Sequence, residues 1–147
     1  MDVVANVMSR NVQVIGPDAT LREAAAMMQE VDTGVLPVTE EDKLVGIITD
    51  RDIALRGVAQ GKGPDAKIRE VMSAEIKYCF EDEDIEHVAQ NLAVLQVRRL
   101  PVVNWEKRLV GIVSLGDLAT NGPATVSARA LHGISQKGGP HNHSRTV

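Results

Sequence analysis

The chain has 147 residues, with 16 Lys and Arg against 20 Asp and Glu and a formal net charge of −4. An acidic balance disfavours binding to a nucleic-acid backbone, and three aromatic residues leave few faces on which bases could stack. No apolar run approaches the length of a membrane span. The single cysteine, Cys79, and the lack of a charged-then-apolar leader predict a reducing, cytoplasmic compartment.

The predicted elements follow one another as short helix, strand, helix, strand, turn, strand and helix. Apolar residues recur at helical spacing over residues 20–31, and Pro17 and Asp18 supply start signals for this helix. Two short apolar strands, GVLPV and LVGII, follow around a polar turn, which predicts a hairpin. Residues 50–58 are then predicted to form another helix, which stops near the region 57–64, where the sequence GVAQGKGPD forms a loop between the copies.

The same order of patterns returns in the second half of the chain. Val7-Met8-Ser9 corresponds to Val71-Met72-Ser73, 64 positions later, and Leu36-Pro37-Val38 corresponds to Leu100-Pro101-Val102. The offset then becomes 65, because one residue is inserted in the polar segment VNWEKR, where a turn tolerates it. Two copies of one unit of about sixty residues therefore fill most of the chain. Each copy alone would be marginally stable, so a shared core with pseudo-twofold symmetry is the simplest arrangement.

The repeat defines the predicted domain organisation. The first unit covers residues 1–62 and the second covers residues 63–120. A C-terminal extension covers residues 121–147, with one short helix predicted around residues 127–134. The sequence KGGPHNHSRTV at the end has the composition of a disordered tail.

Each hairpin ends in a recurring pattern of glycine, two apolar residues, a hydroxyl residue, two variable residues and aspartate. These residues are Gly46, Thr49 and Asp52 in the first copy, and Gly111, Ser114 and Asp117 in the second. One interpretation is a capping box at a strand-to-helix junction. The other is a nucleotide site, in which the helix N-terminus attracts phosphate, the aspartate accepts hydrogen bonds from a ribose diol and the glycine lets a flat ring approach.

Taken together, the VMS start, the DATLREAA helix, the LPV and LVGI hairpin strands and the terminal aspartate resemble a CBS (cystathionine-β-synthase) domain, present twice as a Bateman module. The resemblance covers roughly residues 1–120. It implies an α/β (α+β) fold of two β-α-β-β-α units, related by pseudo-twofold symmetry and packed through their sheets. Clefts between such units often bind AMP, ADP, ATP or S-adenosyl ligands such as S-adenosylmethionine, and such modules commonly form homodimers.

The resemblance also assigns roles to individual positions. The ribose-contacting aspartate of the family corresponds to Asp52 and Asp117, and the phosphate-side hydroxyl corresponds to Thr49 and Ser114. The base slot would be lined by apolar residues of the first strand and by those before the hairpin proline: Val12, Ile76, Leu36 and Leu100. If the clefts lie as in relatives, phosphates would be served by arginines, namely Arg51 and one of Arg98 and Arg99. The alternative for these arginines is pairing with nearby acids such as Asp50 and Glu106.

No catalytic constellation is present in the sequence, so an enzyme is not expected and no cofactor is required. His141 and His143 form an alternate pair without further ligands, so no metal site is expected. The leading hypothesis is a stand-alone regulatory module that senses an adenine nucleotide and acts on an unknown protein partner. The alternative is a structural dimerisation and protein-interaction module with empty clefts, in which the four residues of the boxes are only helix caps.

Overall fold

The computed structural model describes residues 2–136 and divides them into two compact units. Unit 1 comprises residues 2–12, 77–106 and 110–136, and unit 2 comprises residues 13–76 and 107–109. The residues that lead the first repeat thus belong to the same compact unit as the second repeat. The residues that lead the second repeat belong in turn with the first. The two repeats thus exchange their leading segments, residues 2–12 of the first repeat and residues 63–76 of the second.

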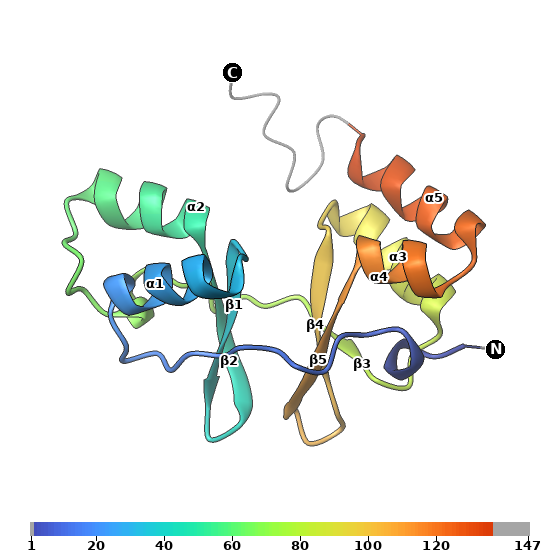
Figure 1. Ribbon diagram of the computed structural model, residues 1–147, viewed down its shortest axis with the longest axis horizontal. Coiled ribbons are helices and arrows are strands. Elements are labelled where there is room, and N and C mark those ends of the chain that lie inside the picture. Colours follow the sequence, from blue (N-terminus) through green and yellow to red (C-terminus); the bar gives the residue numbers. More distant parts are fainter. Residues whose placement is uncertain (1, 137–147) are drawn as a thin grey trace. The chain divides into compact units, whose positions relative to one another are not determined.

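Unit 2 is built around a hairpin flanked by helical segments (Figure 1). Its elements are α1 (Leu21–Val31), β1 (Val35–Glu40), β2 (Lys43–Thr49), α2 (Asp50–Asp52) and the short helical turns η2 (Ile53–Gly57), η3 (Val58–Gln60) and η4 (Ile68–Glu70). α2, the π-helical turn η2 and η3 follow one another without a break, and they include the helix predicted over residues 50–58. β1 and β2 pair antiparallel, with Leu36 opposite Ile48.

Helix α1 begins and ends where local signals place it. The Thr20 side chain accepts a hydrogen bond from the Glu23 backbone N–H at 3.1 Å, and Asp32 ends the helix in a left-handed conformation with φ of 56°. The helix buries one face against the hairpin and against the leading segment of the second repeat. The buried core of unit 2 consists of Ile15, Leu21, Ala24, Met28, Leu36, Val38, Ile48, Ile68 and Val71.

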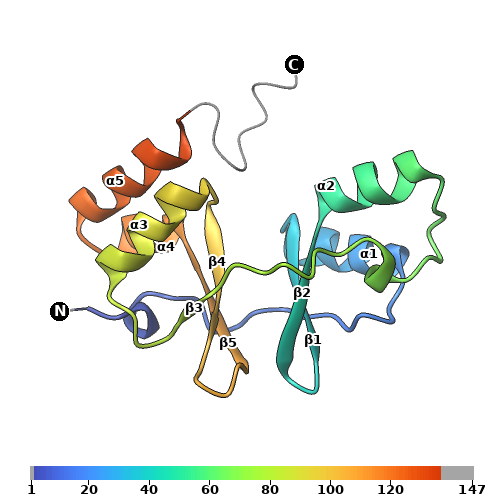
Figure 2. The same cartoon turned by 180° about the vertical axis from the view of Figure 1, so that it is seen from behind.

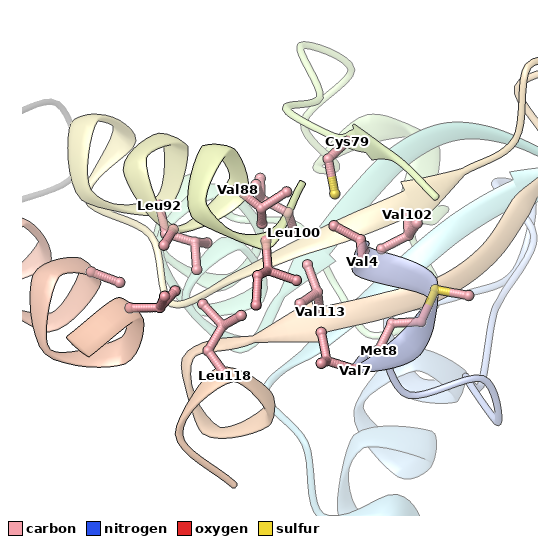
Figure 3. Close-up of a cluster of buried hydrophobic side chains, with 14 residues drawn as sticks. Val4, Val7, Met8, Cys79, Val88, Leu92, Leu100, Val102, Val113 and Leu118 are labelled. Carbon is pink, nitrogen blue, oxygen red and sulfur yellow. The ribbon is translucent and has the colours of Figure 1, made fainter. Parts of the chain in front are cut away.

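Unit 1 repeats this arrangement with a fuller sheet (Figure 2). Its elements are η1 (Val4–Asn6), β3 (Cys79–Phe80), α3 (Ile85–Leu95), β4 (Arg99–Val103), β5 (Leu109–Ser114), α4 (Leu115–Asn121) and α5 (Ala124–Ile134). The strand order is β3-β4-β5, with β3 parallel to β4. Figure 3 shows Val4, Val7 and Met8 of the leading segment packed into the core with side chains from the sheet and from α3 and α4.

Helix α5 has no counterpart in unit 2, and it packs along α3 (Figure 1). Gly133 lies so close to Ala93 that a Cβ at position 133 would overlap the Ala93 methyl group and lie 2.7 Å from its Cα. The Gln96 side-chain amide donates to the backbone carbonyls of Gly133 and Gln136 at the end of the helix. The helix predicted for the extension is therefore present and starts three residues earlier than residue 127, directly after Pro123. The predicted disordered tail, residues 137–147, lies outside the described residues.

The position of the first strand in each repeat differs from the prediction. Val12 and Ile76 were expected on this strand, but both lie in segments without regular secondary structure, at the points where the chain passes from one compact unit to the other. Strand pairing starts three residues later, with a single parallel bridge from Ile15 to Val38 and with Cys79 of β3 opposite Val102. Between the bridges of Ser9 and Ile15, residues 10–14 form no strand, and the Val12 N–H donates to the Arg10 carbonyl oxygen at 3.0 Å.

None of the helices described between residues 2 and 136 combines the length and the apolar content that a membrane span requires.

Candidate functional site

The hydroxyl and carboxylate at the end of β2 form a complete capping box. Asp52 donates its backbone N–H to Thr49 Oγ1 at 3.0 Å, and Asp52 Oδ2 accepts the Thr49 backbone N–H at 3.0 Å. These reciprocal bonds fix the rotamers of both side chains. The second oxygen, Asp52 Oδ1, lies 3.8 Å from Arg56 Nη1, one helical turn later, and the Asp52 side chain is 19% exposed. The box thus leaves one carboxylate oxygen at the surface, held in a defined direction.

Ser114 and Asp117 form the equivalent box at the end of β5. The Asp117 backbone N–H donates to Ser114 Oγ at 3.0 Å, and Asp117 Oδ2 accepts the Ser114 backbone N–H at 2.9 Å. Here the second oxygen also has a hydrogen-bond partner, because Ser9 Oγ donates to Asp117 Oδ1 at 3.3 Å. The two boxes share their backbone geometry but differ in what surrounds the remaining carboxylate oxygen.

The glycine of each motif lies beneath a leading segment. A Cβ at Gly111 would lie 2.7 Å from the Ser9 carbonyl oxygen, and one at Gly46 would lie 3.0 Å from the Ser73 carbonyl oxygen. Antiparallel bridges join Ser9 to Ile112 and Ser73 to Ile47 at these points. The close approach that glycine permits is thus made by the backbone of the chain itself, and the proposed approach of a flat ring is not needed to explain the glycines.

The candidate phosphate-binding arginines lie beside the boxes. Arg51 is exposed between the two acids of α2, and its backbone N–H donates to Asp50 Oδ1 at 2.8 Å. In unit 1 the carbonyl oxygen of Arg98 accepts the Leu115 backbone N–H at 2.8 Å, at the first residue of α4. The side chains of Arg98 and of Arg99, which begins β4, are exposed. Each unit therefore has at least one arginine near its capping box.

The apolar residues assigned to the base slot are less well placed. Leu36 and Leu100 are 1% and 2% exposed and belong to the cores of unit 2 and unit 1. They offer almost no surface to a ligand, because each packs in the layer between hairpin and helix. Val12 and Ile76 are half-buried and lie outside the strands. The roles of all four residues in ligand binding remain predictions.

Arg56 and Ser9 also approach the boxes, although neither was predicted to be a site residue. Arg56 follows Asp52 by four residues, a spacing at which opposite charges on a helix meet, so the sequence held a signal for it. Ser9 has no local signal, because it lies 108 residues from Asp117 in the chain. Only the exchange of leading segments brings Ser9 to the box.

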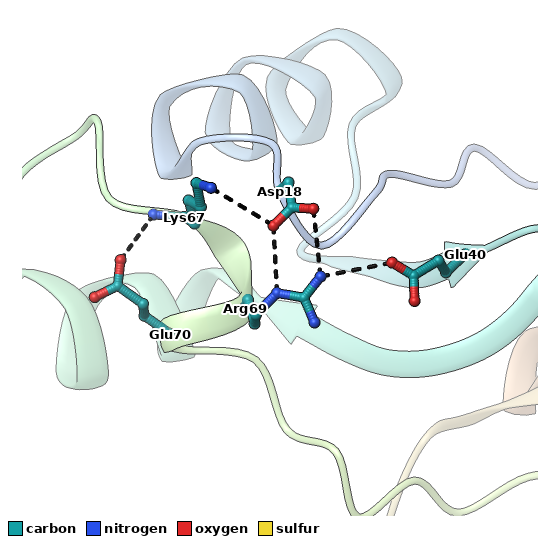
Figure 4. A network of polar contacts seen from close by, with 5 residues as sticks. All are labelled: Asp18, Glu40, Lys67, Arg69 and Glu70. Atoms are coloured by element: carbon teal, nitrogen blue, oxygen red, sulfur yellow. Dashed lines mark hydrogen bonds and ion pairs between the residues drawn. The ribbon is translucent and has the colours of Figure 1, made fainter.

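An exposed ionic network lies in unit 2, outside the capping box (Figure 4). Asp18 accepts hydrogen bonds from Arg69 Nε and Nη2, both at 3.3 Å, and lies 3.8 Å from Lys67 Nζ. Arg69 Nη2 also lies 3.5 Å from Glu40 Oε2. The hydrogen bonds and positive charge of Arg69 lower the pKa of Asp18 below its ordinary value, and Lys67 adds to the effect. The network ties η4 to the turn before α1 and to the end of β1.

Among the residues that the structure describes, no three His, Cys, Asp or Glu side chains gather as metal ligands would. His141 and His143 fall outside this range.

Comparisons with known proteins give the family. The model of the CBS domain matches residues 4–57 and again residues 68–122. CBS domain-containing protein YhcV of Bacillus subtilis is 42% identical over 138 residues, covering 93% of this chain and 98% of YhcV. Together, the repeat, the paired hairpins and the two capping boxes define a tandem module of mixed helices and strands. The chain belongs to the CBS-domain family and carries two CBS domains. The predicted family and fold class are confirmed.

Two solved structures are similar along most of the chain. The crystal structure of Hypoxic Response Protein I, with two coordinated zinc ions, shares 36% sequence identity with a TM-score of 0.76, covering 83% of this chain and 100% of that one. The CBS domain pair of protein MJ0100, in complex with 5-methylthioadenosine and S-adenosyl-L-methionine, shares 31% identity with a TM-score of 0.70. The similarity covers 82% of this chain and 94% of the MJ0100 chain.

Proposed function

We propose that this protein is a regulatory module that binds an adenosine-type ligand and, in its bound state, acts on a separate protein partner rather than catalysing a reaction. The observation that carries the proposal is the rigidly held carboxylate of Asp52, which retains an oxygen at the surface. The homodimeric state and the cytoplasmic location implied by the sequence belong to the same proposal.

The chemistry of the Asp52 carboxylate suits a ribose. A carboxylate offers about four lone-pair sites, and the capping box uses one of them. The 2′- and 3′-hydroxyls of a ribose are neighbouring donors, so one fixed carboxylate can accept both. Because the Thr49 box already fixes the side chain, binding would cost little further ordering of Asp52. Its capping role and a ligand-binding role are therefore compatible.

The difference between the boxes favours unit 2 for a phosphorylated ligand. Asp117 Oδ1 already accepts the Ser9 hydroxyl, whereas Asp52 Oδ1 faces Arg56 at 3.8 Å. Arg51 of α2 adds a second guanidinium near the unit 2 box, while the aligned position in unit 1 is Gly116. Guanidinium groups bind phosphate through charge-assisted hydrogen bonds. We therefore expect AMP, ADP or ATP at Asp52. Asp117, with Arg98 and Arg99 nearby, is the second candidate site.

The domain pair of MJ0100, which binds 5-methylthioadenosine and S-adenosyl-L-methionine, supports an adenosine-type ligand for this chain. Such a ligand regulates a partner only if it binds one arrangement of the protein better than another. Under the alternative function, an interaction module with empty clefts, the boxes cap helices and nothing more. Their reciprocal hydrogen bonds are consistent with that role.

Isothermal titration calorimetry of the ligand-free protein tests the proposal. The ligands are AMP, ADP, ATP, S-adenosylmethionine and 5-methylthioadenosine, each titrated into the wild type and into Asp52→Asn and Asp117→Asn. Asparagine keeps an oxygen for the capping bond but loses the charge and part of the accepting capacity. We expect saturable binding that Asp52→Asn weakens at least tenfold and that Asp117→Asn leaves nearly unchanged for the phosphorylated ligands. Folded protein that binds none of the five would favour the interaction module.

A further inference from the structure

All three aromatic residues of the chain meet in unit 1. Trp105, in the turn between β4 and β5, stacks on Phe80 with ring centroids 4.1 Å apart and planes 13° from parallel. Tyr78 meets Phe80 edge to face at 5.7 Å. The Trp105 indole N–H donates to Asp82 Oδ2 at 3.0 Å, yet the residue is 70% exposed. The indole is therefore held by a ring on one side and a carboxylate at its edge, with much of its surface in solvent.

Asp82 is the counterpart of Asp18, the centre of the ionic network in unit 2. In unit 2 the Ile68 N–H donates to the Ala19 carbonyl oxygen, and in unit 1 the Val4 N–H donates to the Glu83 carbonyl oxygen. Ile68 follows Val4 by 64 positions, and Glu83 follows Ala19 by the same 64. The bridges Thr20 to Lys67 and Asp84 to Val3 obey the same offset. The backbones around the two aspartates are thus arranged alike.

Among the described residues, no arginine or lysine side chain bonds to Asp82 as Arg69 bonds to Asp18. Arg69 supplies two hydrogen bonds to Asp18, whereas the position that corresponds to Arg69 in unit 1 is Ala5. Asp82 bonds instead to the neutral indole of Trp105. Unit 2 thus pairs its aspartate with its own guanidinium, whereas in unit 1, over residues 2–136, the aspartate is bonded to an aromatic ring and the Arg10 guanidinium donates to the Ala5 carbonyl oxygen instead.

The acidic segment that contains Asp82 has few ion pairs. The residues that follow Phe80 are four consecutive acids, Glu81 to Asp84. Within residues 2–136, the single ion pair of these four carboxylates joins Glu83 to His87, which is charged only when protonated. Of these four carboxylates, Asp82 contacts the Trp105 indole, so a cation placed over the exposed ring would interact with the ring and with Asp82 together.

We propose that the surface formed by Trp105, Phe80 and Asp82, here called the aromatic-acidic surface, docks an arginine side chain presented by a segment of a partner protein. This proposal does not depend on the ligand proposed for Asp52. A guanidinium is planar and can stack on the open face of the indole while its N–H groups bond to a carboxylate. The position of Arg69 on Asp18 in unit 2 is the internal example of such a pairing.

A rigid, exposed tryptophan is also the kind of residue on which protein interfaces depend. Aromatic anchors that are already ordered lose little conformational freedom on binding, and tryptophan is enriched among the residues that dominate binding energy. Phe80 is half-buried and connects the exposed ring to the sheet, since it belongs to β3 beside β4. The aromatic-acidic surface is therefore supported by the fold of unit 1 itself.

The experiment uses Trp105 as its own reporter, because it is the only tryptophan in the chain. The full-length protein is titrated with the peptide acetyl-Gly-Gly-Arg-Gly-Arg-Gly-Gly-amide, and the fluorescence of Trp105 is followed. The matched probe replaces both arginines by citrulline, which keeps the shape and removes the charge. We expect a saturable change with the arginine peptide, weakened by salt, and none with the citrulline peptide.

Variants locate the binding by calorimetry. Asp82→Asn should weaken binding of the arginine peptide about tenfold, and Trp105→Ala should abolish it. Trp105→Phe, which keeps a ring able to stack on Phe80, should retain partial binding and show that loss in Trp105→Ala is not loss of folding. The matched control is Asp18→Asn in unit 2, which should bind as the wild type does.

Three results would overturn the proposal. The first is no saturable binding by the wild type, and the second is an equal response to the citrulline peptide. The third concerns the chain's own C-terminal segment, residues 137–147, which contains Lys137 and Arg145 and no acid. If the full-length double variant Lys137→Gln, Arg145→Gln bound the peptide markedly more tightly, this segment would be the natural occupant in place of a partner protein.

Discussion

Replacing Gly133 by alanine should destabilise unit 1, although the same change in most helices is stabilising. In an unobstructed helix, alanine is favoured over glycine by up to about 1 kcal/mol. At Gly133 the new methyl group would overlap that of Ala93 and lie 2.7 Å from the Ala93 Cα, which belongs to the backbone of α3 and cannot rotate away. Overpacking of this kind costs about 1–3 kcal/mol. Subtracting this preference, we expect a net loss of up to about 2 kcal/mol in the free energy of unfolding.

Urea unfolding measures the effect, followed by Trp105 fluorescence for unit 1 and by far-ultraviolet circular dichroism for the whole chain. Gly116→Ala in α4 is the matched control, because its Cβ would meet only Ser114 Oγ at an ordinary 3.6 Å, so this variant should be as stable as the wild type or more stable. If Gly133→Ala were no less stable than Gly116→Ala, α5 would not be packed closely on α3, and the reasoning would fail.

Two further predictions concern buried groups. Gly111→Ala should lower the free energy of unfolding by about 1–3 kcal/mol, because its Cβ would lie 2.7 Å from the Ser9 carbonyl oxygen. In the same urea titration the control Gly63→Ala should leave the free energy of unfolding unchanged, because the space around Gly63 is open. Burial raises the pKa of the Cys79 thiol to about 12, so a thiol reagent at pH 8 should modify Cys79 only after unfolding; rapid labelling of the folded protein would contradict this. An unfolded thiol ionises near pH 8.5, so the Cys79 thiol should stabilise the fold below that pH. Its contribution to the free energy of unfolding should be lost as the pH rises toward 12, and Cys79→Ala should remove this part of the pH dependence.

Much of the fold follows from local patterns in the sequence. The helices α1 and α3 have regular apolar spacing and begin at the capping residues Thr20 and Asp84, and the hairpins are short apolar runs around polar turns. The bounds of these elements were therefore predicted to within a few residues. The capping boxes were equally local, since a hydroxyl and an aspartate three residues apart suffice to form them. The repeat then extended every assignment to the second half of the chain.

The remaining features depend on residues distant in sequence. Val12 and Ile76 alternate with polar residues as a strand would, but a strand needs a partner, and pairing begins only at Ile15 and Cys79. The glycines were assigned to a ligand because nothing local shows that Ser9 and Ser73 pass over them. Trp105 was counted only among the few aromatic residues and was not predicted to be a site residue. It lies in the turn segment VNWEKR, which is one residue longer than its counterpart in the first copy, and this difference indicated that the two hairpin turns are not alike.

The exchange of leading segments has a consequence for how the chain is made. Residues 13–62 emerge from the ribosome before Ile68 and Val71, which complete the core of unit 2. Val4 and Val7 emerge earlier still, yet their neighbours Val113 and Leu118 are synthesised more than a hundred residues later. The first repeat therefore cannot finish its core during its own synthesis, whereas the leading segment that the second repeat needs has already been made. Residues 2–12 must wait for the second repeat, so a chain cut between the repeats should yield two pieces that fold fully only when they are combined.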